Sequence, residues 1–259
     1  MGSSSFDRRL NRILLFIICK NTKRKKTKNM SWITKVLTSS IGNKLLMSLT
    51  GLFLCLFLVV HLAGNLQLLI NDGGENFNAY AKVMETNLLI KLVAYGLYFA
   101  VLLHAFKGLT ITLQNRKARG NKRYAVKATA GSTWTSRNMM LLGSILFIFI
   151  GIHMSNFWYK FKFDHDPQFT YFQIVELGFQ ELWIVIFYVL AQVVLAYHLL
   201  HGFQSAFQTL GLRTGKYDGV IKGLGIGYSV LVPLLFAIIP IFMYMDFYPL
   251  SEFKVIPGQ

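Results

Sequence analysis

The sequence is short of acidic residues, of cysteines and of the motifs that mark soluble enzymes. Only 11 of its 259 residues are Asp or Glu, and only two are Cys. Cys55 lies inside a long apolar run and Cys19 in a basic segment, so we expect neither a structural disulfide nor a thiolate metal site. The chain also lacks a phosphate-binding loop, a dinucleotide fingerprint and a Ser/His/Asp arrangement. These absences exclude nucleotide-dependent and serine-hydrolase chemistry of the common kinds.

Charged residues make up only 15% of the chain, whereas apolar residues make up 54% and the mean hydropathy is +0.45. This composition is too apolar for a soluble domain of this length. Five apolar runs are long enough to cross a hydrocarbon layer of about 30 Å. They cover residues 42–70, 88–113, 138–159, 182–207 and 219–245. Because lipid offers no partner to backbone polar groups and the alternation of a barrel strand is absent, we predict an all-α integral membrane bundle of five helices.

The positive charges fall on alternate loops. Nine of the 27 Lys and Arg residues lie in residues 1–29 and seven more in residues 114–137, whereas the loop 71–87 has only Lys82. By the positive-inside rule the amino terminus is cytoplasmic and the carboxyl terminus lies outside. Because the charge follows the topology, it gives no support to nucleic-acid binding. We expect it to meet anionic lipid or a docked soluble partner.

Residues 1–29 differ from the rest of the chain. Their apolar run, 14–19, is too short to span a membrane, and no signal-peptide cleavage site follows it. We expect this basic segment to be a disordered tail, with Met30 as the true start of the protein. Residues 30–259 then form a single membrane domain, which begins with an amphipathic segment carrying Trp32 at the interface.

Four of the six histidines lie one each in the first four spans, at His61, His104, His153 and His198. An ionisable side chain inside a bilayer marks a functional site by default. At about 1.5 Å per residue, His61 and His153 lie about 25 Å from one side of the membrane, and His104 and His198 about 20 to 25 Å from the other. Two levels with a histidine pair at each result. Low-spin haem iron takes paired imidazoles as axial ligands, and bundles build cofactor sites from facing helices, so we interpret the pairs as ligands of two stacked b-type haems.

The two halves of the bundle repeat one pattern. In each half one glycine stands ten residues before the first histidine, and another stands four residues after the second. These glycines are Gly51 and Gly108 in the first half, and Gly143 and Gly202 in the second. A glycine four residues after a histidine lies on the same helix face and could clear room for a flat macrocycle. Alternatively, such residues only let helices approach closely, as Gly219, Gly223 and Gly227 predict for the fifth span against the other four.

The fourth span offers a second histidine, His201, three residues after His198 and about 60° from it around the helix. Periodicity leaves both open as ligands. The repeat favours His198, because it stands four residues before a glycine, as His104 does in the second span. We expect His201 to lie one turn nearer the cytoplasm, with a haem propionate or a backbone carbonyl as its partner.

These residues resemble the single-chain dihaem cytochrome b anchor of succinate:quinone oxidoreductases and quinol:fumarate reductases. The resemblance covers about residues 30–248. Its motifs are specific in combination, whereas each motif alone is weak. It rests on Ser48, Thr50-Gly51-Leu52-Phe53, His61-Leu62 and Asn65 in the first span, His104-Ala105 and Gly108 in the second, Trp134, Gly143 and His153 in the third, and His198, Gly202 and Gly211 in the fourth.

The resemblance implies a subunit of the respiratory chain in the inner membrane of a bacterium. Such a subunit anchors a flavoprotein carrying FAD and an iron–sulfur protein at the cytoplasmic face, and its haems relay electrons between the clusters and a quinone. Menaquinone is usual for the type with two haems on one chain. Succinate itself is not converted in this subunit. The implied cofactor-binding residues are the four histidines with Ser48, Gly51, Gly108, Gly143, Gly202 and Trp134.

Two positions need separate comment. Some members of the family place a glutamate two residues before the fourth-helix ligand as a proton path, whereas this chain has Ala196, so the resemblance gives no support to such a path here. Glu85 lies near the position of a quinone-associated carboxylate in some members, which implies a role in quinone proton transfer. The alternative for Glu85 is an ordinary surface carboxylate.

Two other functions stay open. Intramembrane histidines also mark ion pathways, so the chain could be a transporter with a proton relay. A relay needs polar residues at successive depths along one path, whereas two levels with a pair at each favour haem. The chain could also be the dihaem anchor of another membrane dehydrogenase, such as a hydrogenase or a formate dehydrogenase.

Overall fold

A computed structural model describes residues 39–120, 133–164 and 166–245. The predicted tail, Met30, Trp32 and the basic residues 121–132 lie outside this part of the chain. The chain divides into two units, residues 1–42 and 43–259. Of the first unit only the start of one helix is described, where the Gly42 amide donates to Ser39 Oγ at 3.0 Å. The fold and sites below belong to the second unit.

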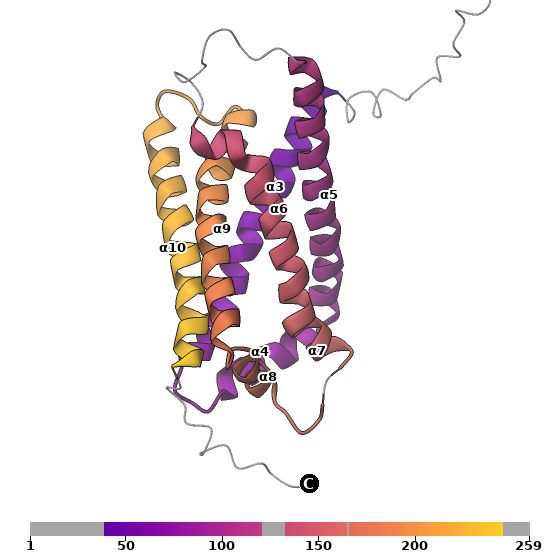
Figure 1. Cartoon of the computed structure of the whole chain (residues 1–259), viewed down its shortest axis with the longest axis vertical. Coiled ribbons are helices and arrows are strands. Elements are labelled where there is room, and N and C mark those ends of the chain that lie inside the picture. Colours follow the sequence, from indigo (N-terminus) through magenta and orange to yellow (C-terminus); the bar gives the residue numbers. More distant parts are fainter. Residues whose placement is uncertain (1–38, 121–132, 165, 246–259) are drawn as a thin grey trace, which may run out of the picture. The chain divides into compact units, whose positions relative to one another are not determined.

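All regular structure in the described residues is helical, and five helices are long and apolar enough to cross a membrane (Figure 1). They are α3 (Ser40–Asn65) with the short turn η1 (Leu66–Leu69), α5 (Leu88–Arg119), α6 (Trp134–His153) with η2 (Met154–Tyr159) and α7 (Lys160–Lys162), α9 (Leu182–Thr209) and α10 (Asp218–Tyr244). The prediction of a five-span, all-helical protein is confirmed.

Local capping sets where two of the spans begin and end. The Asn87 side chain accepts the amide hydrogens of Leu89 and Ile90, at 2.9 and 3.2 Å, and so starts α5. The same helix runs on to Arg119, beyond the apolar run, because its last residues are good helix formers, and it stops at Gly120 with φ +67°. Thr133 caps α6 by accepting from Ser136, so this span begins before its apolar run does.

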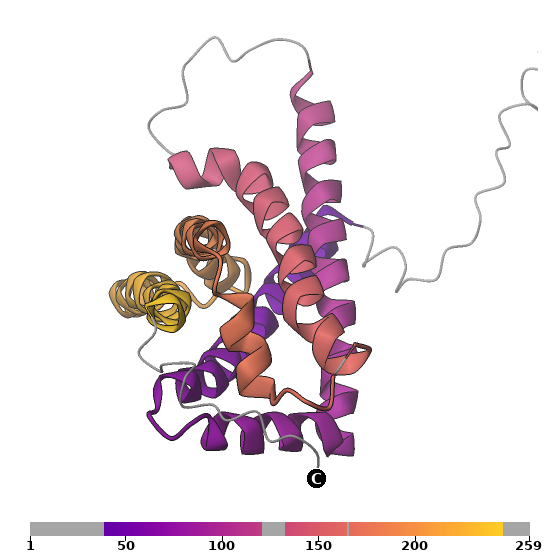
Figure 2. The same ribbon diagram turned by 60° about the horizontal axis from the view of Figure 1, so that its bottom comes forward.

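Two short helices, α4 (Glu75–Thr86) and α8 (Tyr171–Gly178), lie against each other at one end of the spans (Figures 1 and 2). We name this the capped end, and the end where α5 stops and α6 starts the open end. The Phe172 amide donates to Asn78 Oδ1 at 2.9 Å, which ties α8 to α4. Gly74 has φ +84°, and a Cβ there would lie 2.3 Å from the Phe172 ring, so only glycine fits.

The hydrophobic core lies towards the capped end. Leu68 and Phe172 are fully buried, with 0% of each residue exposed. The other buried members of this cluster are Leu62, Phe77, Phe157, Val175, Phe179, Val185, Tyr188, Val232, Ile239 and Met243. They come from α3, η1, α4, η2, α8, α9 and α10, so the capped end is where elements distant in the sequence pack together.

Helix α10 packs on α9 through a different face from the predicted one. Gly219, Gly223 and Gly227 are exposed, and a Cβ added to any of them would meet nothing within 4 Å, so the prediction that this series packs against the other helices is wrong. The buried series is Ile221, Gly225 and Ser229. The two series are offset by two residues, about 200° around the helix, and a Cβ at Gly225 would lie 3.0 Å from Phe203 on α9.

Candidate functional site

The four intramembrane histidines lie as two facing pairs. The ring centroids of His61 on α3 and His153 on α6 are 5.8 Å apart, and those of His104 on α5 and His198 on α9 are 6.3 Å apart. The interplanar angles are 86° and 65°. Each pair therefore joins one helix of the first half of the chain to one of the second. These are the partners that counting along the spans predicts.

The two pairs lie at different levels of the bundle. His61 lies near the capped end, and Gly51, ten residues earlier on α3, lies against His104. A Cβ at Gly51 would be 3.2 Å from Cε1 of His104. Ten residues of helix rise about 15 Å, so the two levels are separated by about that distance along α3.

The same contact recurs in the second half of the chain. A Cβ at Gly143 on α6 would lie 3.6 Å from Cε1 of His198 on α9. In both halves, therefore, the glycine ten residues before one histidine lies against the histidine of the other level, in a tight contact at Gly51 and in an ordinary van der Waals contact at Gly143. In the sequence these glycines are seen only as residues that stand ten positions before a histidine. Their contacts run between helices, and no spacing along a single helix could have identified them.

The other predicted cofactor residues have varied surroundings. Gly108 lies against the Met47 side chain, 3.2 Å from a Cβ position, so it lets α3 and α5 approach, as the alternative interpretation expects. A Cβ at Gly202 would meet nothing within 4 Å. Ser48 is buried and donates to the Lys44 carbonyl of its own helix at 3.0 Å. Trp134 is 53% exposed and its ring meets Tyr197. Their contacts with a cofactor stay predictions.

Aromatic rings surround the pair at the capped end. His61 stacks on Phe57 at 5.2 Å between centroids, and it also meets Phe236 of α10. His153 contacts the rings of Phe149, Phe157 and Tyr188. Phe157 reaches this cluster from η2, a π-helical turn directly after His153, and in the same turn Asn156 Nδ2 donates to the Tyr188 hydroxyl at 3.3 Å. The sequence contains no signal for this turn.

The histidines of the two halves differ in the partner of Nδ1. In the first half, Nδ1 of His104 lies 3.1 Å from Thr50 Oγ1, and Nδ1 of His61 lies 3.3 Å from the Asn65 side-chain nitrogen. In the second half, Nδ1 of His153 and of His198 are buried and have no hydrogen-bond partner among the described residues. A buried polar atom without a partner costs about 1 to 3 kcal/mol. Such atoms point to function rather than to packing.

The pairs fit haem better than a free metal ion. In the part of the chain that the structure describes, no group of three or more His, Cys, Asp or Glu side chains is placed to hold a metal ion. Two imidazoles are half of a tetrahedral zinc site, but they are the complete axial set of a haem iron. With metal–imidazole bonds of about 2 Å, rings on opposite sides of one ion have centroids about 6 Å apart. The observed 5.8 and 6.3 Å agree with that spacing.

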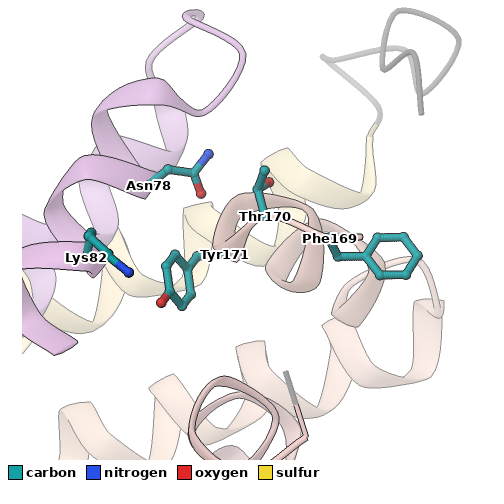
Figure 3. A pocket seen from close by; sticks show the side chains of 5 residues that line it. All are labelled: Asn78, Lys82, Phe169, Thr170 and Tyr171. Carbon is teal, nitrogen blue, oxygen red and sulfur yellow. The ribbon is translucent and has the colours of Figure 1, made fainter. Parts of the chain in front are cut away.

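Glu85 lies at the capped end, where it accepts a hydrogen bond from the Tyr171 hydroxyl of α8. Burial, and then the hydrogen bond and negative charge of Glu85, raise the pKa of Tyr171 to about 12. Next to this contact lies a surface pocket of about 310 Å³, lined by Asn78 and Lys82 of α4 and by Phe169, Thr170 and Tyr171 (Figure 3). Glu85 is therefore part of a contact between α4 and α8. Its role with a quinone stays a prediction.

Comparison with protein-family models, with curated proteins and with solved structures finds no match. The functional interpretation therefore rests on the residues of this chain and on their geometry.

Proposed function

We propose that this protein is the cytochrome b membrane anchor of a succinate dehydrogenase or fumarate reductase in a bacterial inner membrane. It relays electrons between an iron–sulfur subunit and a quinone, with menaquinone as the expected quinone, through two bis-histidine haems b. One observation carries the proposal. Histidines from four separate spans lie as two facing pairs, with ring centroids 5.8 and 6.3 Å apart, at two levels of a membrane bundle.

Each residue near the pairs has a task in this proposal. His61 and His153 would hold one haem iron, and His104 and His198 the other; a bound haem would supply a one-electron carrier. Thr50 holds the His104 ring through Nδ1, the usual way in which a neighbouring group orients a metal-binding histidine. Phe57, Phe149 and the other rings at the capped end exclude water from the His61–His153 pair.

The partners are proposed from the charge of the open end. Arg116 and Lys117 lie in the last turns of α5 there, where the positive-inside rule puts the cytoplasm. A flavoprotein with FAD and an iron–sulfur protein would dock at this end. The quinone would react near Glu85 at the opposite, capped end, because a carboxylate can take up or release the proton that accompanies quinone chemistry.

A second candidate is a proton-relay transporter, and Gln192 favours it. This residue lies on α9 between Tyr188 and His198, is only 8% exposed, and its Oε1 has no hydrogen-bond partner among the described residues. A relay would need such a group between the two histidine levels. An amide does not titrate near neutral pH, however, so Gln192 could conduct protons only together with water.

A difference spectrum of the purified full chain, dithionite-reduced minus oxidised, decides between these candidates. The cytochrome proposal expects a b-type α band and two haems per chain. A missing α band would overturn the cytochrome proposal, and with it the alternative in which the chain anchors another membrane dehydrogenase. The proton-relay transporter would then be the remaining candidate.

Purification in mild detergent tests the partners. We expect two larger soluble subunits and succinate:quinone activity in the same fraction. A lone 29.5 kDa chain with both haems and full quinone turnover would contradict the anchor role.

A further inference from the structure

Lys107 is a positive charge inside a membrane-spanning helix. It follows His104 by three residues on α5, and its ammonium donates to Asn43 Oδ1 of α3 at 2.8 Å. A lysine near the end of a span commonly extends its side chain to water. Here the ammonium instead turns to the neighbouring helix, where Asn43 is only 2% exposed. The partly buried cation is therefore held against α3.

The Lys107–Asn43 pair offers hydrogen-bond donors but no negative charge. An ammonium has three donors and no acceptor, so the amide oxygen of Asn43 must face it and the amide nitrogen must face elsewhere. Neither side chain has a further hydrogen bond or ion pair among the described residues. A partly buried cation whose only partner is a neutral amide is poorly compensated. An anion would compensate this charge.

The pair lies on the same helix contact as the open-end histidines. Going from the open end, α3 meets α5 through Asn43 with Lys107, then Met47 with Gly108, then Gly51 with His104. Asn43 precedes Gly51 by eight residues, about 12 Å of helix. The unpaired charge thus lies between the His104–His198 pair and the open end of the bundle.

The second half of the chain has a counterpart at the same register. Lys107 and Gly108 stand three and four residues after His104, and His201 and Gly202 stand three and four residues after His198. The half-buried His201 ring also has no hydrogen-bond partner among the described residues. On both helices, a nitrogen donor therefore follows the paired histidine by one turn towards the open end.

We propose that Lys107 and Asn43 bind a carboxylate of the macrocycle held by His104 and His198, and that His201 is the matching donor for its second carboxylate. The proposal rests on the proposed function, because it requires a haem at this pair. The chemistry recognised is an anionic oxygen group. A lipid phosphate has the same chemistry, so the experiment has to separate these two sources.

The first arm compares single lysine variants of the full chain. Lys107→Gln should weaken retention of one haem about tenfold and lower the midpoint potential of that haem, because a nearby cation favours the reduced iron. If the loss of affinity is tenfold larger for reduced than for oxidised haem, the midpoint potential falls by about 59 mV. Lys160→Gln removes one charge at an exposed position of α7, away from the Lys107–Asn43 pair, so it should change neither haem. Equal behaviour of the two variants would overturn the proposal.

Asn43→Asp separates anion binding from a merely structural contact. If the Lys107–Asn43 pair only holds α3 and α5 together, an aspartate at position 43 replaces the hydrogen bond with an ion pair. The midpoint potentials of both haems then stay unchanged. If the pair is an anion site, the new carboxylate occupies Lys107 and repels the carboxylate of the haem. We therefore expect Asn43→Asp to lower the same midpoint potential as Lys107→Gln does. An unchanged potential would overturn the proposal.

The last arm identifies the anion and separates the two proposals. The full-length apoprotein is reconstituted with haem or with its dimethyl ester, in neutral and in anionic detergent–lipid mixtures. The tenfold difference in haem retention between wild type and Lys107→Gln should vanish with the ester, which has no free carboxylates. It should not depend on the lipid. A difference that follows the anionic lipid would instead assign the site to a phosphate and overturn the carboxylate. Failure of the wild-type protein to bind haem would remove the proposed function itself, whereas two firmly bound haems whose retention is the same in wild type and in Lys107→Gln would remove only this inference.

Discussion

The two histidine pairs have the same ligand chemistry in different surroundings. The His61–His153 pair at the capped end lies among aromatic rings from α3, α6, η2, α9 and α10. The His104–His198 pair towards the open end lies against two glycines, Gly51 and Gly143, with a threonine and a lysine close by on α3 and α5. One site is built by packing of large side chains. The other is built by small residues and polar contacts.

This difference suggests how two chemically equal haems would acquire different properties. Aromatic packing excludes water and fixes the rings through many weak contacts, so a single change there is partly absorbed by its neighbours. The glycine contacts leave less room, because a Cβ would lie 3.2 Å from His104 at Gly51 and 3.6 Å from His198 at Gly143, so a large side chain at either position must displace a histidine ring. We therefore expect the open-end pair to be the more sensitive to single substitutions, and its potential to depend more on nearby charge.

The largest effect should come from the ligands themselves. His198→Ala should remove one haem and leave one, because Ala offers no ligand to the iron, and His153→Ala should do the same at the other level. His201→Ala should retain both haems and at most shift one midpoint potential. Haem counted per chain is the measurement. Loss of one haem in the His201 variant but not in the His198 variant would reverse the assignment, and loss of both haems in any single variant would show that the two sites are not independent.

Gly51→Leu should disturb only the open-end pair. Its Cβ would start 3.2 Å from Cε1 of His104, so the leucine must push the ring away from His198 and reduce occupancy of one haem by half or more. Gly96→Leu, on α5 with nothing within 4 Å of its Cβ position, is the matched control and should keep two haems. An intact two-haem spectrum in the Gly51 variant would mean that the glycine contact does not set the ring position.

Glu85→Gln tests whether the capped end has a role beyond holding its haem. We expect several-fold slower quinone turnover with both haems in place, because the amide cannot exchange the proton of the quinone. Glu75→Gln, an exposed residue at the start of the same helix, serves as control. Turnover equal to wild type would make Glu85 a structural partner of Tyr171 and nothing more.

Tyr188→Phe should have a smaller effect, on stability. It removes the hydroxyl that accepts from Asn156 at 3.3 Å but keeps the ring that packs on His153. A net loss of about 1 kcal/mol is typical for one such hydrogen bond. Tyr197→Phe, on an exposed part of the same helix, gives the baseline. Denaturation in detergent measures both, and loss of a haem in the Tyr188 variant would show that the aromatic site is less tolerant than we infer.

The smallest effect concerns pH at the capped end. The pKa of Tyr171 is raised to about 12, so the folded protein holds this proton more tightly than the unfolded chain does. The resulting stabilisation is complete below pH 10 and is lost as the pH rises towards 12. Melting temperatures of wild type and Tyr171→Phe should therefore differ more at pH 9 than at pH 12. A difference that grows with pH would contradict the direction of this shift.

Much of the fold could be predicted from the sequence, because long apolar runs and their flanking charges are local. The spans start and end within a few residues of their predicted limits, except where caps and good helix formers extend them, as at Thr133 and Arg119. Counting along the helices also predicts which histidines share a level. The glycine series of α10 was assigned to the wrong face, because two apolar faces with the same four-residue spacing cannot be told apart without the neighbouring helix.

The sequence by itself determined the number of spans, their apolar lengths and the placing of one paired histidine on each of the first four. These are properties of consecutive residues and of the helical repeat. Only the tertiary structure decided that Gly51 and Gly143 face histidines of other helices, that a π turn after His153 carries Asn156 to Tyr188, and that Lys107 bonds to Asn43. In each of these contacts the two residues lie 32 to 64 positions apart in the sequence. The contact therefore exists only once the helices have packed.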